Sequence, residues 1–302
     1  MIAERIGAQL GLDLEYVEKV ALTASYRYKS YTIPKRTGGM RTIHHPSREL
    51  KLLQGWLVDS VLSRLPVHKA ALAYRKGISI RNHAAVHVGQ NYLLKIDFKD
   101  FFPSIAEADI TRILRHESLR RAGLELTAQD LQFVGRIVCR KGFLTIGAPS
   151  SPILSNAVLF DFDDHWYEES ERINVKYSRY ADDLYFSTDR RGILSGVLDR
   201  VRADLAHRPS PRLTINDTKT VFTSRKRSRL VTGLILTSDK RISLGRHRKR
   251  HIRSLVYKNQ SSGLSDEQRE YLRGFIAYAR SVEPTFVEAL RRKYGSKTID
   301  SV

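Results

Sequence analysis

Apolar side chains recur along the chain at two spacings, one typical of helices and the other of strands. Residues 14–22 and 50–65 place them at i, i+3 and i+4, as Leu53 and Trp56 illustrate, which predicts two amphipathic helices. Ser47 is a suitable N-cap for the second helix. The same spacing predicts further helices over residues 107–121, 127–139, 152–171, 192–206, 246–258, 266–281 and 284–294.

Three other segments have the composition of β-strands. The stretch "YTIPKRTGGMRTIHHP" (31–46) joins two β-prone runs through Gly38 and Gly39, which predicts a hairpin. The stretch "YLLKIDFKDFF" (92–102) is predicted as a strand, and "VKYSRYADDLYFS" (175–187) as a strand that folds back on itself. Strands mixed with helices, without internal repeats, indicate the α+β class.

Three aspartates lie where these strands end or turn. Asp97 follows an apolar run, and Asp182 and Asp183 occupy the predicted turn. If the strands lie side by side, the carboxylates would repel one another unless cations were present, and two Mg²⁺ ions about 3.5–4 Å apart would suit them. The alternative is that the Asp pair only ends a strand at a solvated turn, which is the commoner outcome for an isolated pair.

Charge narrows the class of partner. The 302 residues include 52 Lys and Arg against 32 Asp and Glu, a net charge of +20. Residues 221–302 hold 19 of the Lys and Arg but 7 of the Asp and Glu. This excess predicts a polyanionic partner such as nucleic acid, although a merely soluble basic surface is the alternative.

Cysteine content and hydropathy indicate the compartment. Cys139 is the only cysteine, which excludes a disulfide framework and zinc-finger spacing and fits a reducing cytoplasm. No stretch approaches the roughly 18 consecutive apolar residues of a membrane span. Charged residues such as Glu4 and Arg5 stand where a signal peptide would be apolar. We therefore expect a cytoplasmic protein without a membrane partner.

Several strings in a fixed order identify a family resemblance. "KIDFKDFFPSI" (95–105), "GAPSSPILSN" (147–156) and "RYADDLYFS" (179–187) together resemble the palm of reverse transcriptases, the RNA-directed DNA polymerases. The resemblance implies a right-hand architecture: N-terminal helices and fingers over 1–90, an antiparallel palm over 91–236 with part of the fingers at about 107–150, and a short, basic helical thumb over 237–302.

The resemblance also implies the catalytic centre. Asp97 and Asp182 would ligate two Mg²⁺ ions, the Phe98 carbonyl would assist one of them, and Asp183 would complete the site. The reaction would be attack of a terminal hydroxyl on the α-phosphate of a dNTP, a nucleotidyl transfer. Two-metal nucleases use the same kind of carboxylate site, so the flanking strings, and not the aspartates, distinguish a polymerase from a nuclease.

Further residues resemble the family's nucleotide pocket. Phe102 matches the steric gate that excludes a ribose 2′-OH, while either Phe101 or Phe102 could be ordinary core. Gly147 and Ala148 match the loop beneath the nucleotide. Relatives commonly have Pro-Gln where this chain has Thr145-Ile146, which removes an amide contact.

Basic side chains resemble those that hold the triphosphate. Lys35, Arg36 and Arg41 lie near the tip of the predicted hairpin, with Arg41 the first choice and Lys35 the second. Lys219 matches the family lysine proposed to protonate the leaving pyrophosphate. A solvated hairpin tip and a plain surface lysine are the respective alternatives.

Two strings indicate the retron branch of the family. "LVTGLIL" (230–236) carries the retron Val-Thr-Gly, and "NHAAVHVG" (82–89) resembles the retron Asn-Ala-x-x-His, with His83 in place of Asn. His87 matches its histidine, and a buried, hydrogen-bonded histidine is an equal alternative. The length leaves no room for an RNase H, protease, maturase or endonuclease domain, which disfavours retroviral and intron-encoded types.

The retron resemblance implies the partners. Retron enzymes bind one structured noncoding RNA, prime from the 2′-OH of an internal guanosine and make a branched RNA–DNA product (msDNA) within an antiphage system that has a separate effector protein. The basic segment 240–253 and the following aromatics suit a thumb that tracks phosphates, although packing in the thumb core is the commoner role for such aromatics. The predicted RNA or template-primer contacts are His87, Val231, Thr232, Gly233, Arg246, Arg248, Lys249 and Arg250. The rival interpretations are a noncatalytic RNA-binding scaffold and another bacterial class, of the abortive-infection or diversity-generating type.

Overall fold

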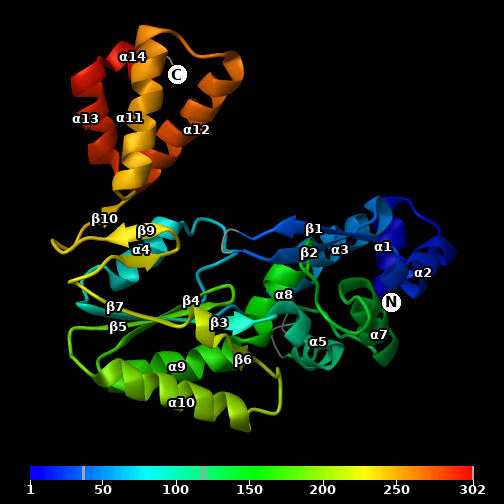
Figure 1. Ribbon diagram of the computed structural model, residues 1–302. Coiled ribbons are helices and arrows are strands. Elements are labelled where there is room, and N and C mark those ends of the chain that lie inside the picture. Colours follow the sequence, from blue (N-terminus) through cyan, green and yellow to red (C-terminus); the bar gives the residue numbers. More distant parts are fainter. Residues whose placement is uncertain (36–37, 117–118, 121, 301–302) are drawn as a thin grey trace.

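The computed structural model describes residues 1–35, 38–116, 119–120 and 122–300 of the chain. An antiparallel sheet lies at its centre, with a helical lobe to one side and a C-terminal helical bundle above (Figure 1). The sheet has the order β4-β5-β3-β6, and β7 also pairs with β3. Its strands are β3 (Tyr92–Lys99), β4 (Lys176–Tyr180), β5 (Asp183–Thr188), β6 (Thr214–Ile215) and β7 (Val221–Ser224).

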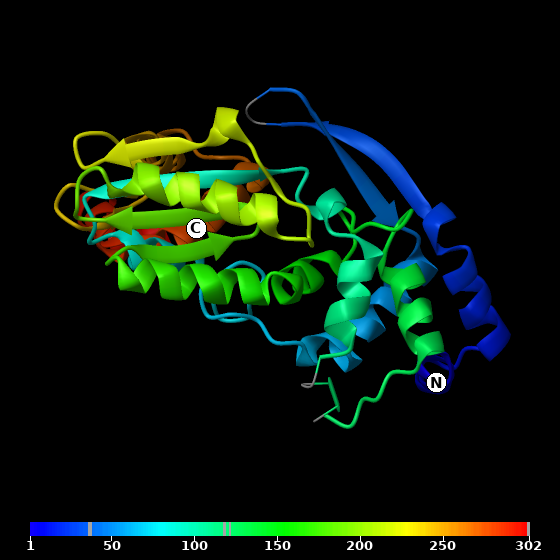
Figure 2. The same cartoon turned by 90° about the horizontal axis from the view of Figure 1, so that it is seen from below.

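The two faces of the sheet bury different hydrophobic clusters because side chains alternate along each strand. Leu94 and Ile96 of β3 join the larger cluster, which is covered by α9 (Phe160–Arg172) and α10 (Ile193–His207). Figure 2 shows these two helices across that face of the sheet. Leu93 belongs to the second cluster on the opposite face.

The helical lobe is formed by the N-terminal helices and by later helices that lie between β3 and β4 in the sequence (Figure 1). A two-stranded ribbon of β1 (Tyr28–Pro34) and β2 (Met40–Pro46) extends from it toward the sheet (Figure 1). The ribbon precedes α3 (Arg48–Ser60), whose first turn is capped by the Ser47 hydroxyl accepting from the Leu50 N–H at 3.3 Å. The other helices of the lobe are α1 (Ile2–Leu10), α2 (Leu14–Leu22), α5 (Glu107–Leu114), α7 (Ala128–Val138) and α8 (Ser151–Val158).

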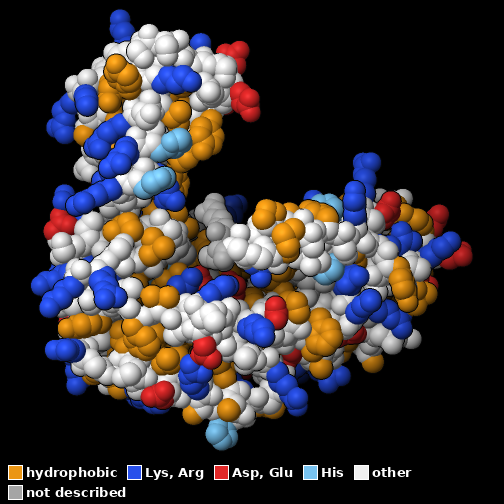
Figure 3. Space-filling view, viewed as in Figure 1, with side chains coloured by type: hydrophobic (Ala, Val, Ile, Leu, Met, Phe, Trp, Pro, Cys, Tyr) orange, Lys and Arg blue, Asp and Glu red, His pale blue; other side chains and the backbone are white. Residues whose placement is uncertain are grey.

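The C-terminal bundle is mounted on a small sheet of order β10-β9-β8. The apolar faces of its helices contribute to the second cluster. An open groove separates this bundle from the β1–β2 ribbon (Figure 3). The elements are β8 (Arg229–Val231), β9 (Leu234–Leu236), β10 (Ile242–Ser243), α11 (Arg246–Ser261), α12 (Asp266–Val282), α13 (Pro284–Tyr294) and α14 (Ser296–Asp300), and α4 (Ile80–His87) packs beneath β9.

The predicted elements match the structure with definite exceptions. The helix expected over 152–171 is two helices, α8 and α9, that break at Leu159. The helix expected over 107–121 ends earlier, because Leu114 is the last residue of α5. The residue pattern did not predict α1, α4, or the short strands β6 to β10. Within the residues described, no helix combines the length and apolar character needed to cross a bilayer.

Candidate active site

The three aspartates come together at one end of the central sheet. Asp97 of β3 lies directly opposite Asp183 of β5 in the antiparallel register, so their side chains share a face. Asp182 occupies the turn between β4 and β5, and its carbonyl accepts the Phe98 N–H at 2.9 Å. The structure therefore joins residues that are far apart in sequence at a single edge.

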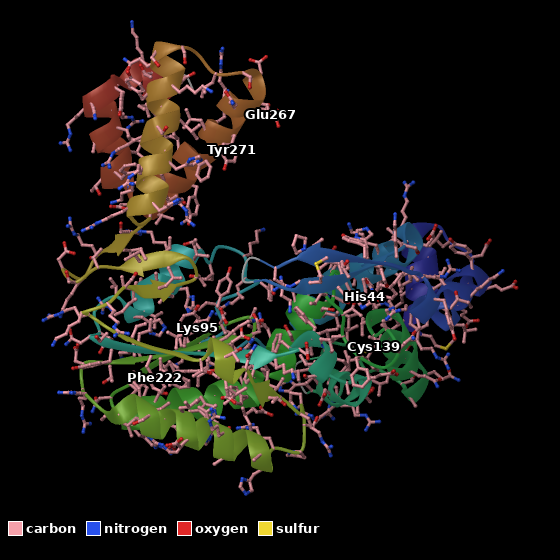
Figure 4. The ribbon with its side chains drawn as sticks, viewed as in Figure 1. His44, Lys95, Cys139, Phe222, Glu267 and Tyr271 are labelled. Carbon is pink, nitrogen blue, oxygen red and sulfur yellow. The ribbon has the colours of Figure 1, made fainter. Side chains whose placement is uncertain are left out.

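Two lysines neutralise part of this acidic cluster. Lys219, in the short 3₁₀ helix η4 (Asp217–Lys219), places its Nζ 3.0 and 3.1 Å from the two carboxylate oxygens of Asp97. Lys95 lies on the same face of β3 as Asp97, and its Nζ is 2.7 Å from Asp183 Oδ2. Figure 4 labels Lys95 on the side of the sheet away from α9 and α10. The structure thus supplies cations of its own beside the carboxylates.

Burial and repulsion still leave the cluster electrostatically strained. Burial raises the pKa of Asp182, and the neighbouring Asp97 raises it further. Burial also raises the pKa of Asp183 to about 6, although Lys95 opposes the shift. Asp183 Oδ1 is buried and has no hydrogen-bond partner among the described residues. These carboxylates would gain from an additional positive charge.

The donor set fits divalent magnesium, although the carboxylates are not gathered around a common point. Among the residues described, no group of three or more His, Cys, Asp and Glu lies close enough together to hold a metal ion. Lys219 engages both oxygens of Asp97, so an ion bound there would compete with that ammonium group. The fit rests on the hard oxygen donors, their mutual repulsion and the unpartnered Asp183 oxygen.

A buried arginine fixes the turn that carries Asp182. Arg179 of β4 is fully buried, and its Nη2 forms an ion pair with Asp163 Oδ2 at 2.6 Å. Its Nη1 donates to the carbonyl of Ala181 and to Asn156 Oδ1, both at 3.1 Å. Ala181 has φ 56°, a left-handed conformation that is unfavourable for alanine. The guanidinium group therefore holds a strained residue immediately before Asp182.

A cavity of about 600 Å³ opens beside this turn, between the sheet edge and the β1–β2 ribbon. Phe101 and Phe102 both line it, but Phe101 is buried and stacks on Phe98, whereas Phe102 is only partly buried. Arg36 lies outside the described residues. Of the predicted nucleotide-binding residues, Lys35, Arg41, Phe102 and Lys219 line the cavity together with Asp182.

The loop that holds Gly147 and Ala148 contacts the β1–β2 ribbon at His44. Gly147 has φ 112°, and a Cβ built on it would lie 2.7 Å from the His44 carbonyl oxygen, so the position requires glycine. Ala148 is 3% exposed and does not line the cavity, although Thr145 and Ile146 do. The role of Gly147 is therefore the close approach of two backbones, since the Ile146 carbonyl accepts the His44 N–H at 2.9 Å.

The structure corrects the prediction that His87 contacts nucleic acid. Its side chain is fully buried, and its ring nitrogens are 2.7 Å from the hydroxyls of Ser178 and Ser187. His83 Nε2 is 2.8 Å from the same Ser178 hydroxyl. Burial lowers the pKa of His83 to about 3 and that of His87 well below its usual range. The buried, hydrogen-bonded alternative therefore describes His87.

One further predicted RNA contact needs the same correction. Val231 is fully buried in the second hydrophobic cluster, so its side chain cannot touch a nucleic acid. Lys249 is partly exposed and forms an ion pair with Glu283, and its contact with RNA stays a prediction. The remaining predicted contacts lie around the turn between β8 and β9 and at the start of α11: Thr232, Gly233, Arg246, Arg248, Lys249 and Arg250.

Those remaining residues differ in how freely they could reach a ligand. Thr232 and Gly233 both have positive φ, and the Gly233 carbonyl accepts from Arg248 Nη1 at 3.2 Å. Arg248 also donates to the Tyr278 hydroxyl at 3.1 Å, so it ties the turn to the helical bundle. Arg246 and Arg250 are exposed.

Several residues at the site escaped the sequence reasoning. Lys95 could have been found, because it precedes Asp97 by two residues, and alternation along a strand places both side chains on the same face. Arg179 gave a weaker signal, a cation between aromatic residues just before the Asp pair. Tyr74 and Arg140 also line the cavity, and no local pattern marks them, since only tertiary folding brings them there.

Comparison with known proteins identifies the family. Residues 33–257 match the family described as "Reverse transcriptase (RNA-dependent DNA polymerase)". The Retron Ec83 reverse transcriptase of Escherichia coli is 37% identical over 278 residues, which cover 91% of this chain and 89% of that protein. The Retron Ec86 reverse transcriptase of Escherichia coli is 32% identical over 298 residues, which cover 96% of this chain and 89% of the relative.

A solved structure supports the fold. Apo telomerase from Candida tropicalis superposes with a TM-score of 0.50 at 12% identity, covering 89% of this chain and 60% of that chain. The predicted right-hand polymerase fold of the α+β class is confirmed. The chain belongs to the reverse transcriptase family, the RNA-dependent DNA polymerases, and within that family to the retron reverse transcriptases.

Proposed function

We propose that this enzyme copies part of a structured noncoding RNA into single-stranded DNA that stays branched to the RNA, within an antiphage system. The observation that carries the proposal is the placement of Asp97 opposite Asp183 in the sheet, with Asp182 in the adjoining turn, where it lines a cavity of about 600 Å³. Its retron relatives support the choice of RNA as template.

The acidic cluster would supply the metal site. Reverse transcriptases generally use divalent metal ions, and we assign Asp97, Asp182 and Asp183, with the Phe98 carbonyl, as ligands of two Mg²⁺. When bound, such ions lower the pKa of the attacking hydroxyl and stabilise charge on the phosphoryl oxygens. The protein's own part is alignment, for which the Arg179 contact to the Ala181 carbonyl is suited.

The cavity residues would bind and select the dNTP. Arg41 and Lys35, on the ribbon, are suited to neutralise the triphosphate. Phe102 would fill the space that a ribose 2′-OH needs, and Gly147 would keep the loop backbone close to the ribbon. Lys219 would pass from Asp97 to the leaving pyrophosphate and donate a proton to it, which is a short move because it lines the same cavity.

The RNA and its DNA product would run along the groove between the ribbon and the C-terminal bundle (Figure 3). Arg246, Arg250 and the turn at Thr232 and Gly233 are its proposed contacts on the bundle side. The separate effector protein and the cytoplasmic location stay predictions from the resemblance and the composition.

Sequencing the nucleic acid that copurifies with the wild-type protein tests this proposal. The expected result is one structured RNA species joined through a 2′–5′ branch to single-stranded DNA, and digestion with a debranching enzyme should release that DNA. Bulk ribosomal RNA without attached DNA would instead support the noncatalytic scaffold.

A further inference from the structure

A second hollow lies at the base of the β1–β2 ribbon and shares no lining residue with the nucleotide cavity. It has a volume of about 600 Å³ and is formed where η1 (Ala24–Tyr26) leads into β1 and where β2 leads into α3. Its lining residues are Tyr26, Arg27, Tyr28, Lys29, His45, Pro46, Ser47, Arg48 and Lys51. None of these positions belongs to the proposed catalytic or nucleotide-binding machinery.

The charge of this hollow is strongly positive. Lys29, Arg48 and Lys51 are exposed, and none of them forms an ion pair with any residue in the described part of the chain. Arg27 adds a fourth cation, and its Nε donates to the Thr23 hydroxyl at 2.7 Å. Lys and Arg side chains are visible over the ribbon and the adjoining helices in Figure 3.

One carboxylate accompanies these cations. Glu49 accepts a hydrogen bond from the Ser47 hydroxyl at 2.6 Å, which, with its own backbone and the nearby arginines, lowers its pKa. Glu49 therefore stays ionised and offsets one of the four positive charges. The hollow keeps a positive excess, which suits a ligand with several negative charges.

A largely exposed aromatic ring stands at the rim of the hollow. Tyr26 is 88% exposed, the largest exposed fraction among the large hydrophobic side chains of the described residues. Tyr28, two positions later, is anchored instead, because its hydroxyl accepts from Gln54 Nε2 at 2.9 Å. The buried Ala24 fixes the start of the same 3₁₀ turn. Tyr26 is thus held out into solvent by a well-anchored segment.

We propose that this hollow binds an unpaired stretch of the RNA partner, with a base stacked on Tyr26 and phosphates held by Lys29, Arg48 and Lys51. Exposed aromatics interleaved with cations are the arrangement that binds single strands without reading their sequence. A volume of about 600 Å³ admits one nucleotide with room for its neighbour's phosphate. This inference rests on the proposed function in taking the polyanion to be RNA.

The segment that carries Tyr26 is connected to the wall of the nucleotide cavity. The Lys141 N–H, from a residue that lines the nucleotide cavity, donates to the Ser25 hydroxyl at 3.1 Å, and Ser25 precedes Tyr26. An RNA strand held at Tyr26 is therefore anchored on a segment fastened to the wall of the nucleotide cavity. The bound RNA would be fixed at the ribbon base as well as along the C-terminal bundle.

Binding of a labelled single-stranded RNA oligonucleotide of mixed sequence, followed by fluorescence anisotropy over a series of salt concentrations, tests the inference. Tyr26→Ala should weaken binding by about 5- to 150-fold, whereas Tyr26→Phe keeps the stacking face and should stay within about twofold of wild type. The double variant Lys29→Glu/Lys51→Glu should reduce the slope of log K against log salt by about 1.4, since each phosphate contact on a single strand contributes about 0.7.

The matched control reverses two charges elsewhere. Arg191→Glu/Arg200→Glu alters two exposed positions, one just before α10 and one within it. This helix covers the face of the sheet that is turned away from Lys95 (Figure 4). The control should leave the slope nearly unchanged. Equal weakening by the control, or wild-type binding by both Tyr26→Ala and Lys29→Glu/Lys51→Glu, would overturn the inference.

A parallel primer-extension assay at saturating RNA template separates the two proposals. All of these variants should extend a DNA primer at the wild-type rate, because their side chains lie outside the nucleotide cavity. If the wild type extends primers but the variants bind RNA normally, only the inference about the hollow fails. If the wild type neither extends primers nor binds RNA, the proposed function itself fails.

Discussion

Replacing Arg179 should separate the stability of the palm from the alignment of its catalytic turn. The side chains of Arg179 and Asp163 are both fully buried, and the guanidinium group also donates to the Ala181 carbonyl. Arg179→Met would leave the Asp163 charge without its partner inside the protein. Breaking a buried pair in this way costs about 3–5 kcal/mol of unfolding free energy.

A double variant removes the unpaired charge but still lacks the hydrogen bond to the Ala181 carbonyl. In Arg179→Met/Asp163→Asn neither charge remains, while an amide oxygen can still accept from the Tyr177 hydroxyl, which is 2.7 Å from Asp163 in the wild type. Stability should recover to within about 2 kcal/mol of wild type. The Ala181 carbonyl still lacks its charged donor, a bond worth about 1.5–3 kcal/mol.

If that bond holds Asp182 in place during the reaction, kcat in both variants should fall by about 10- to 100-fold. The KM for dNTP should change little, since Arg179 does not line the nucleotide cavity. Urea unfolding measures the stability, and single-turnover incorporation of one nucleotide measures the rate and its dependence on dNTP. A double variant with restored stability and wild-type kcat would refute the reasoning.

Three other perturbations have expected outcomes. Acid should destabilise the fold: His83 and His87 are neutral when folded because burial depresses their pKa, and they take up protons near pH 6.5 when unfolded. The contribution of these histidines to the free energy of unfolding is therefore fully present above about pH 6.5, and it falls by about 2 kcal/mol per histidine at pH 5. Unfolding curves that coincide at pH 7 and pH 5 would contradict this. Phe102→Ala should raise incorporation of rNTP relative to dNTP by about 10- to 100-fold in competition assays, and unchanged discrimination would remove its gate role. Gly147→Ala should cost about 1–3 kcal/mol of unfolding free energy, because its Cβ would meet the His44 carbonyl at 2.7 Å in a left-handed backbone; a denaturation midpoint equal to wild type would argue against that clash.

Helices and strands that are long enough to show a repeating hydrophobic pattern could be predicted from sequence. The strand that carries Asp97 and the turn at Asp182 and Asp183 were predicted because strand composition and adjacent charges are local signals. Strands of two to four residues such as β6 and β7 are too short to show a period, and their existence depends on pairing with β3. Pairing partners distant in sequence leave no such signal.

Burial explains why some site residues were misassigned. Val231 belongs to a string typical of retrons, but the string does not indicate that its side chain faces the hydrophobic cluster. His87 was equally compatible with a ligand contact and with a satisfied core position, and only the placement of Ser178 and Ser187 decides between them. Arg179 escaped notice because its partner Asp163 lies on a different element.

The central claim is that Asp97, Asp182 and Asp183 together join dNTPs on an RNA template, and primer extension tests it most directly. Wild type and Asp182→Asn are compared on the same RNA template and DNA primer, with dNTPs and Mg²⁺. We predict DNA synthesis by the wild type and none above background by Asp182→Asn, with both proteins equally folded by circular dichroism. Equal synthesis by both proteins, or none by the wild type on any RNA, would contradict the claim.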